Sequence, residues 1–87
     1  MTLSKEKYDL LLLDPESSSL PEIQDLKRIV ENAKKLFECD LNKVFKWVSK
    51  PNHLFFGFSP YQMAMGGRGS VVYRWQEELT EDASPLN

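Results

Sequence analysis

An apolar repeat between Ile23 and Phe37 constrains the fold of this chain more than any other feature. Its members recur at steps of three and four residues: Ile23, Leu26, Ile29, Val30, Ala33, Leu36 and Phe37. This spacing places them on one stripe of an α-helix. Pro21 suits the first turn of that helix, because the N–H that proline lacks is not needed there. The sequence therefore predicts an amphipathic helix from about Pro21, whose stripe other elements must cover.

A second helix is predicted directly after the first, so that the two form a helical hairpin. Asp40 can accept hydrogen bonds from the free amides of a new helix, and Pro51 prevents its continuation. Between them the helical spacing is repeated by four apolar residues, Leu41, Val44, Phe45 and Val48. The turn of the hairpin is expected at about Glu38 to Asp40.

Two further helices are predicted in the last third of the chain. Ser59-Pro60-Tyr61-Gln62 combines a cap residue, a proline at the first helical position and a glutamine three residues after the cap, which is the pattern of a capping box. Gly66 is expected to end that short helix. Ser70 is expected to cap a last helix, in which Val72, Trp75 and Leu79 share a face. Trp47 and Trp75 are assigned to the core, because each lies within a helix beside apolar neighbours.

The N-terminal segment is less constrained. Ser4 to Leu13 fits a helix capped by Ser4, but its contiguous leucines fit a strand nearly as well. With 87 residues there is room for one core. We therefore expect an all-α fold, a small bundle of four to five short helices. Residues 1–20 are expected to form an N-terminal arm, which consists of a linker with or without one short helix. Residues 21–79 are expected to form the helical domain, and residues 80–87 a flexible acidic tail.

Charge and composition exclude several classes of function. Eleven Lys and Arg against thirteen Asp and Glu give a net charge of −2, whereas nucleic-acid binders usually carry a basic excess, so nucleic acid is not the favoured partner. The longest aliphatic run, Leu10 to Leu13, is far shorter than the roughly 20 residues of a membrane span. A single cysteine, Cys39, excludes an intrachain disulfide framework and suits a reducing compartment. These features predict a cytoplasmic protein without membrane contact, small enough that a homodimer is a natural expectation.

Catalytic and metal-binding groups are sparse. Cys39 and His53 are the one cysteine–histidine pair, and acidic residues, Glu38 and Asp40, flank the cysteine, so a structural role of Cys39 is favoured over a nucleophilic one. Zinc needs three or four Cys, His or acidic ligands in close array, which one cysteine and one histidine do not supply. We therefore expect no enzyme, no metal and no cofactor.

Aromatic residues and glycines gather in one segment. All four glycines lie between Gly57 and Gly69, and Phe55, Phe56, Phe58 and Tyr61 lie in or beside the same stretch. Two interpretations have about equal weight: the four rings complete the core, or one or two of them anchor a partner. The run Gly66 to Ser70 is favoured as a tight turn over a phosphate site at a helix N-terminus, which leaves Arg68 free for a partner. The predicted partner-binding residues are Phe55, Phe56, Phe58, Tyr61, Arg68, Gly69 and Arg74.

A family pattern runs through the same half of the chain. Its elements are Ala33-x-x-Leu36-Phe37, Trp47-Val48-Ser49-Lys50-Pro51-Asn52, Phe56-Gly57-Phe58-Ser59-Pro60 and Gly67-Arg68-Gly69-Ser70-Val71-Val72. In order and spacing these elements resemble the Xre/MbcA/ParS antitoxin toxin-binding domain. The resemblance implies a small helical protein that dimerises and binds a RES-type toxin, an enzyme that consumes NAD, by covering or plugging its active site.

Carried over by position, the resemblance assigns two roles. Six residues would shape the scaffold turn: Trp47, Pro51, Asn52, Gly57, Ser59 and Pro60. Gly67, Arg68, Gly69 and the last helix would lie near the toxin. The expected function is thus an antitoxin-like module that inhibits a partner enzyme by direct contact.

Two alternatives to the antitoxin stay open. One is a phage-borne or free-standing inhibitor or adaptor protein that uses the same fold against another target. The other is a small DNA-binding regulator, supported by five lysines around the hairpin: Lys34, Lys35, Lys43, Lys46 and Lys50.

Overall fold

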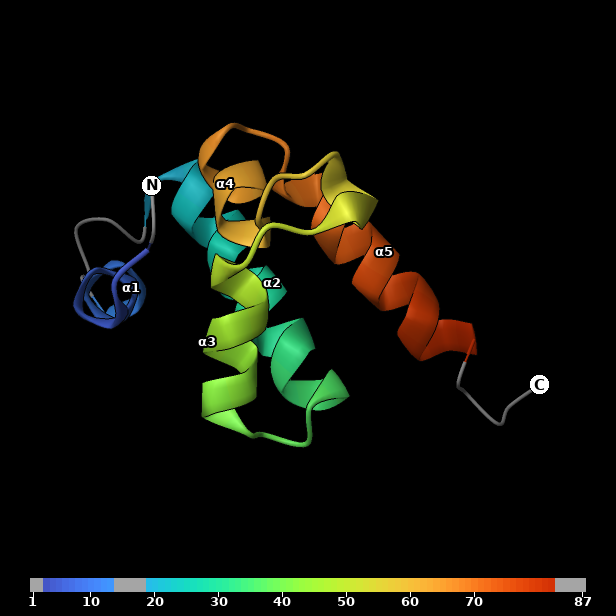
Figure 1. Cartoon of the computed structure of the whole chain (residues 1–87). Coiled ribbons are helices and arrows are strands. Elements are labelled where there is room, and N and C mark those ends of the chain that lie inside the picture. The colour runs from blue at the N-terminus through green and yellow to red at the C-terminus, as the bar shows by residue number, and fades with distance from the viewer. Residues whose placement is uncertain (1–2, 14–18, 83–87) are drawn as a thin grey trace.

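The computed structural model describes residues 3–13 and 19–82, with side chains described as far as Leu79. These residues form five α-helices, the 3-10 turn η2 and no strand. The elements are α1 (Lys5–Leu13), α2 (Pro21–Leu36), α3 (Leu41–Ser49), η2 (His53–Phe55), α4 (Pro60–Met65) and α5 (Gly69–Asp82). The predicted all-α bundle of four to five short helices is confirmed (Figure 1).

Helix α2 is the centre of the bundle and contacts each of the other four helices. Its buried residues belong to the predicted stripe: Ile23, Leu26, Ile29, Val30 and Ala33. Val44 and Val48 of α3, Met63 and Ala64 of α4 and Val72 of α5 complete the core. Leu36, the last residue of α2, is 38% exposed although it belongs to the predicted stripe.

The predicted caps of α3 and α4 are confirmed. Asp40 Oδ1 accepts hydrogen bonds from the backbone N–H groups of Asn42 and Lys43, at 3.1 and 3.2 Å. Ser59 Oγ accepts from the Gln62 N–H at 3.0 Å, and Gln62 Oε1 accepts from the Ser59 N–H at 2.9 Å, which is a complete capping box. Helix α4 ends at Met65, so that Gly66 follows it directly, as expected.

The cap predicted for the last helix is wrong. Helix α5 begins at Gly69, so Ser70 lies within its first turn instead of in front of it. The reason is tertiary packing: a Cβ atom at Gly69 would lie 2.7 Å from the Cβ atom of Asp25 on α2. Because Gly69 has no side chain, the start of α5 packs directly against α2, and the helix begins two residues earlier than a cap at Ser70 would give.

The N-terminal segment is helical and packs on the domain. Ser4 Oγ accepts a hydrogen bond from the Lys7 N–H at 3.2 Å, which confirms the predicted cap of α1. Tyr8 is buried, and its ring meets the Phe45 ring of α3 edge-on with 5.0 Å between centroids. At the other end, the backbone of α5 continues to Asp82, three residues beyond the predicted end of the domain. The remainder of the predicted linker and tail, residues 14–18 and 83–87, lies outside the described residues.

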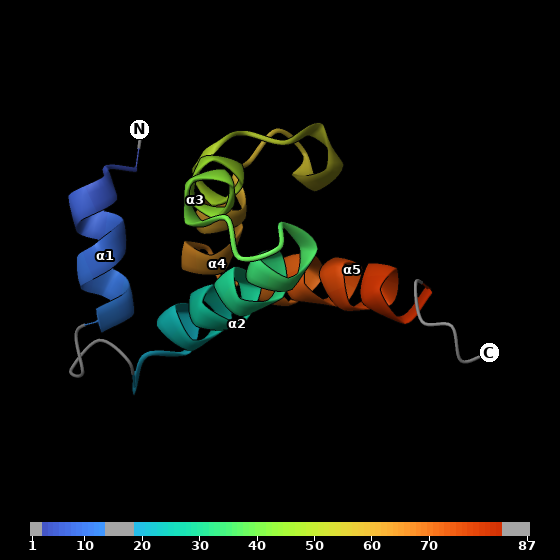
Figure 2. The same ribbon diagram turned by 90° about the horizontal axis from the view of Figure 1, so that it is seen from below.

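A polar cluster fixes α5 against α2, the helix pair with the most extensive contact (Figure 2). Arg28 donates to both carboxylate oxygens of Glu77 at 2.7 Å, and Asn32 Nδ2 donates to Glu77 Oε2 at 2.9 Å. The Arg28 guanidinium also lies 4.1 Å from the centroid of the Tyr73 ring. The hydrogen bonds from Arg28 and Asn32 lower the pKa of Glu77 to about 2. This cluster joins the middle of α2 to α5, beside the buried hydrogen bond at 3.0 Å that Gln76 Nε2 donates to the Ile29 carbonyl.

No helix among residues 3–13 and 19–82 combines the length and the apolar character that crossing a bilayer requires.

Candidate partner-binding site

The segment from Asn52 to Phe58 forms a bend that is closed by hydrogen bonds to Asn52. The Asn52 side chain accepts from the Leu54 N–H at 2.9 Å, and its backbone carbonyl accepts from the N–H groups of Phe55 and Gly57 at 3.0 and 3.1 Å. The Asn52 N–H donates to the Phe58 carbonyl at 3.1 Å. Four bonds to one residue fix the backbone of the bend, so the side chains it carries leave from defined positions.

Phe55 faces the interior of the protein. It is 1% exposed, and its ring meets the rings of Trp47 and Trp75 edge-on, at centroid distances of 6.1 and 5.6 Å. The two tryptophans stack on each other at 6.1 Å, in keeping with their predicted place in the core. The prediction that Phe55 contacts a partner is therefore wrong, because its ring is covered by Trp47 and Trp75.

Phe56 faces solvent. Its side chain is 76% exposed, and its backbone has a φ of 59°, in the left-handed region that non-glycine residues rarely adopt. Leu54 and Phe58 beside it are 49% and 46% exposed. The bend thus carries three large apolar side chains on its outer side, and a backbone conformation that is unfavourable for phenylalanine holds one of them there.

Phe58 and Arg68 meet at a hollow of about 260 Å³, which Gln62, Met63 and Gly66 also line. The turn after α4 is what brings Arg68 there: its N–H donates to the Met63 carbonyl at 2.7 Å, and Gly67 takes a φ of 81° that suits glycine. Arg68 is exposed and is in no ion pair with a described residue. The hollow is large enough for one side chain of a partner and has a cation at its edge.

The other predicted contact residues are dispersed. Tyr61 is half-buried and packs against the core. Gly69 is buried against Asp25 of α2. Its predicted contact with a partner is therefore wrong, because α2 already covers it. Arg74 is exposed on α5 but is not among the residues that line the hollow. The structure therefore reduces the predicted site to Phe56, Phe58 and Arg68, with Leu54 added.

The charge around this site was not recognised in the sequence, although the signal is there. From Leu41 to Gln76 the sequence contains no Asp or Glu, and it contains five Lys and Arg: Lys43, Lys46, Lys50, Arg68 and Arg74. The net charge of −2 conceals this, because the acidic residues lie in the segments before and after. The bend and the turn after α4 lie within the acid-free segment, so Arg68 and Lys50 are the charged residues nearest to the bend and the turn in the sequence, while Asp25 of α2 packs against the neighbouring Gly69.

Groups with catalytic or metal-binding chemistry do not gather among the described residues. No three His, Cys, Asp or Glu side chains come close enough together there to hold a metal ion. Cys39 is exposed in the turn between α2 and α3, and His53 is exposed in η2. What the site offers is an apolar contact surface, a hollow and positive charge, which are the properties of a surface that binds a macromolecule.

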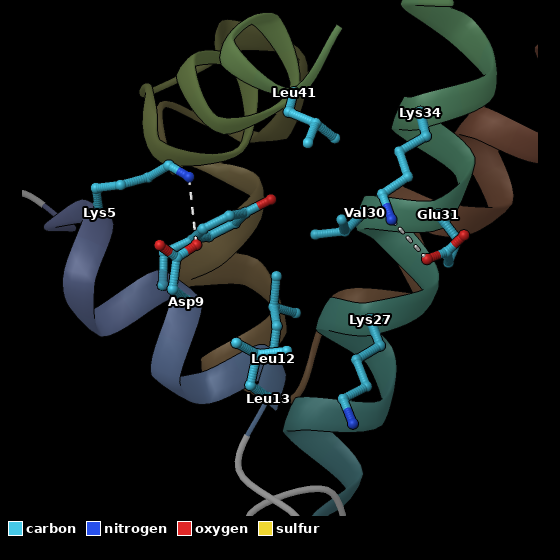
Figure 3. A pocket seen from close by; sticks show the side chains of 10 residues that line it. Lys5, Asp9, Leu12, Leu13, Lys27, Val30, Glu31, Lys34 and Leu41 are labelled. Atoms are coloured by element: carbon cyan, nitrogen blue, oxygen red, sulfur yellow. Dashed lines mark hydrogen bonds and ion pairs between the residues drawn. The ribbon is translucent and has the colours of Figure 1, made fainter. Parts of the chain in front are cut away.

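A second concave feature lies at the other side of the bundle, between α1 and α2, and sequence reasoning missed it. Figure 3 shows this groove, with Lys5, Asp9, Leu12 and Leu13 on the α1 side, Leu41 at one end and its α2 wall formed by Lys27, Val30, Glu31 and Lys34. Its volume is about 530 Å³. The groove exists because α1 docks on α2 and α3, a tertiary contact that the four consecutive leucines do not reveal.

No family model, curated protein or solved structure matches this chain. The resemblance to the antitoxin domain therefore depends on the sequence elements quoted above. The function has to be argued from the surface itself.

Proposed function

We propose that this chain is a protein-binding module that inhibits a partner enzyme by direct contact, in the manner of an antitoxin. The observation that carries the proposal is Phe56, whose ring is 76% exposed on a backbone closed by hydrogen bonds. Exposed phenylalanines on rigid turns are suited to act as anchors in a partner's pocket.

Energetics support this interpretation of Phe56. A non-glycine residue in the left-handed region costs about 1–2 kcal/mol, and burial of its ring by a partner would recover roughly 1.5–3 kcal/mol. In the isolated chain the Phe56 ring is 76% exposed, so it gains little hydrophobic stabilisation. The cost of the left-handed backbone at Phe56 is therefore not offset within the chain itself. Such positions are common at ligand contacts.

The surroundings of Phe56 define the chemistry of the partner. Phe58 and Leu54 are 46% and 49% exposed on the same bend, so the contact is apolar beyond one ring. Arg68 at the hollow and the acid-free segment around it favour acidic groups on the partner's facing surface. The partner surface we propose is an apolar pocket with carboxylates at its edge.

The partner enzyme that the sequence resemblance suggests is a RES-type, NAD-consuming toxin. Inhibition by contact requires no reactive group on the inhibitor, and the described residues bring no catalytic cluster together. The same surface would serve a phage-borne or free-standing inhibitor or adaptor, so the identity of the target has to be tested directly.

Co-expression with a RES-type toxin tests the proposal. The wild-type chain is expected to restore growth, and Phe56→Ala and Arg68→Glu are expected to abolish this protection while the circular-dichroism melt stays unchanged. Leu10→Ala and Lys7→Glu are matched controls, because both residues are exposed on α1, at the other side of the bundle from the bend. These controls are expected to protect like the wild type.

The negative outcomes separate the alternatives. Failure of the wild-type chain to relieve toxicity, combined with a pull-down partner whose binding requires Phe56, would retain the binding module and replace the toxin by another target. Binding that survives both Phe56→Ala and Arg68→Glu would show that the bend is not the contact surface.

A DNA-binding regulator is the second candidate, and one observation favours it. Lys43 and Lys46 are exposed three positions apart on one face of α3, Lys50 is exposed directly after the helix, and none is in an ion pair with a described residue. Lys34, by contrast, is paired with Glu31 at 3.0 Å. A band-shift titration at increasing salt decides: binding that weakens steeply with salt and is lost on changing these three lysines to glutamate supports DNA contact, and no shift at low salt excludes it.

A further inference from the structure

The groove between α1 and α2 has the size of a small-molecule site. Its volume of about 530 Å³ falls within the roughly 300–1,000 Å³ that such sites occupy. In Figure 3 the side chains of Leu12 and Leu13 face Val30 across the gap, and Leu41 lies at the end nearer to Lys34. Leu13 and Leu41 are 79% and 58% exposed, so a molecule in the groove would remove apolar surface from water.

The charged side chains of the groove are largely compensated. Lys5 pairs with Asp9 at 3.2 Å on the α1 side, and Lys34 pairs with Glu31 at 3.0 Å on the α2 side. An anion placed between them would approach both carboxylates as closely as the ammonium groups. Lys27 is in no ion pair with a described residue, but its flexible stem lets the ammonium stay in water while the methylene groups line the groove.

The Tyr8 hydroxyl is the polar group of the lining that can donate to a ligand without carrying a charge. Tyr8 is 5% exposed and lines the groove, and its hydroxyl has no hydrogen-bond partner among the described residues. Burial, followed by the charges of Asp9 and Glu31, raises the pKa of Tyr8 to about 12, so the hydroxyl keeps its proton at neutral pH. No buried side-chain nitrogen or oxygen among the described residues lacks a hydrogen bond, so the Tyr8 oxygen lies at the open side of the groove, where it can donate to a ligand.

We propose that this groove binds a small, uncharged and largely apolar molecule that carries one hydrogen-bond acceptor, such as the carbonyl of an ester or ketone. The apolar part contacts Leu12, Leu13 and Val30, and the acceptor receives the hydrogen bond from the Tyr8 hydroxyl. The site is separate from the bend that carries Phe56 and does not depend on the proposed inhibition of an enzyme.

Methyl octanoate is a suitable probe, titrated into the 15N-labelled full chain and followed by NMR. Amide shifts are expected to concentrate on α1 and on the α2 segment from Lys27 to Lys34. Tyr8→Phe keeps the ring and its contact with Phe45, and is expected to weaken binding roughly two- to twelve-fold, the range of one hydrogen bond. Tyr73→Phe is the matched control, because Tyr73 lies on α5 and does not line the groove; it is expected to bind the probe like the wild type.

Leu13→Glu provides a second variant whose folding is not at risk, since the side chain it replaces is 79% exposed. It is expected to weaken binding of methyl octanoate at least ten-fold, because it places a carboxylate beside the alkyl chain. Equal affinity of the wild type, Tyr8→Phe and Leu13→Glu would overturn the proposal, and so would shifts centred on the bend instead of the groove.

Octanoate distinguishes an uncharged ligand from an anion. It is expected to bind more weakly than its methyl ester, and Lys27→Gln is expected to leave binding of the ester unchanged. Tighter binding of octanoate that is lost in Lys27→Gln would overturn the uncharged class and assign the groove to a carboxylate ligand. Formation of dimers on the groove in place of probe binding, seen by light scattering, would show that a second copy occupies it and would also overturn the proposal.

Discussion

Phe55 and Phe56 are neighbours in the chain with identical side chains, and the protein uses them in opposite ways. Phe55 is 1% exposed between two tryptophans, whereas Phe56 is 76% exposed. The difference arises in the backbone: Phe56 has a φ of 59°, which turns its side chain away from the direction that Phe55 takes. Backbone conformation, and not residue type, divides this bend into a buried half and an exposed half, and the exposed half is the contact surface that we propose.

The same division occurs in the turn before α5. Arg68 is exposed at the hollow beside Phe58, and the next residue, Gly69, is buried against Asp25. In each pair one residue is buried and holds the backbone in place, namely Phe55 or Gly69. Its neighbour in the sequence, Phe56 or Arg68, is exposed and available for contact. Substitutions at each pair should therefore separate stability from binding.

The largest effect is expected for Phe55→Ala. Removal of a fully buried phenylalanine costs about 3–5 kcal/mol, because the cavity between Trp47 and Trp75 cannot close completely. A urea titration followed by tryptophan fluorescence measures this loss. Phe56→Ala is the control, with a midpoint expected within a few tenths of a molar of the wild type. Similar losses for the two variants would remove the distinction between the two halves of the bend.

Gly69→Ala is expected to have the next largest effect. The added Cβ would lie 2.7 Å from the Cβ of Asp25, an atom next to the α2 backbone that cannot move aside without shifting the helix. Overpacking of this kind costs about 1–3 kcal/mol. Thermal melts of Gly69→Ala and Arg68→Glu compare the two neighbours, and only the first should melt earlier. A wild-type melt for Gly69→Ala would mean that α5 does not approach α2 so closely.

Local sequence signals were sufficient for most of the fold. The stripe from Ile23 to Ala33, the Asp40 cap and the capping box of Ser59 and Gln62 all follow from interactions within a few residues, and all are confirmed. The cap assigned to Ser70 is wrong, because the start of α5 is set by contact with Asp25, which lies 44 positions earlier in the sequence. Spacing rules contain no information about such a contact.

The candidate site was predictable as a region but not residue by residue. Composition pointed to the aromatic and glycine-rich segment, yet it did not separate Phe55 from Phe56, since that separation depends on the left-handed conformation of Phe56 and on the two tryptophans. The groove beside Tyr8 was not foreseen at all. It results from how α1 docks on α2 and α3, and the run from Leu10 to Leu13 fits more than one such arrangement.

Phe56→Asn is expected to have a smaller effect, in the opposite direction from Phe55→Ala. Asparagine tolerates the left-handed region better than phenylalanine, so the variant is expected to be more stable by about 0.5–1 kcal/mol. Phe56→Ala also removes the ring but keeps the unfavourable conformation, and it is expected to show no such gain in a denaturant titration. Both variants should lose binding to the partner. A loss of stability in Phe56→Asn would show that the exposed ring contributes to the fold.

The smallest effect is expected from the half-exposed ion pair that holds α5, and it should appear as a dependence on pH. The pKa of Glu77 is lowered from 4.5 to about 2 in the folded chain by hydrogen bonds from Arg28 and Asn32. A carboxylate with a lowered folded-state pKa stabilises the fold above its unfolded value, so this contribution is complete above about pH 5 and decreases as the pH falls from 4.5 towards 2.

Glu77→Gln isolates this contribution. The melting temperature of the wild type should exceed that of Glu77→Gln at pH 6, and the difference should shrink at pH 3, because Glu77 is then protonated in the unfolded chain and folding has to release that proton. Glu78→Gln is the matched control, since Glu78 is exposed on the same helix and is in no ion pair with a described residue. The difference at pH 6 is expected to be small, because solvent screens exposed pairs. A difference in melting temperature that stays constant between pH 6 and pH 3 would mean that Glu77 acts through packing alone. The apolar core would then fix the direction of α5, and with it the position of Arg68 beside Phe58.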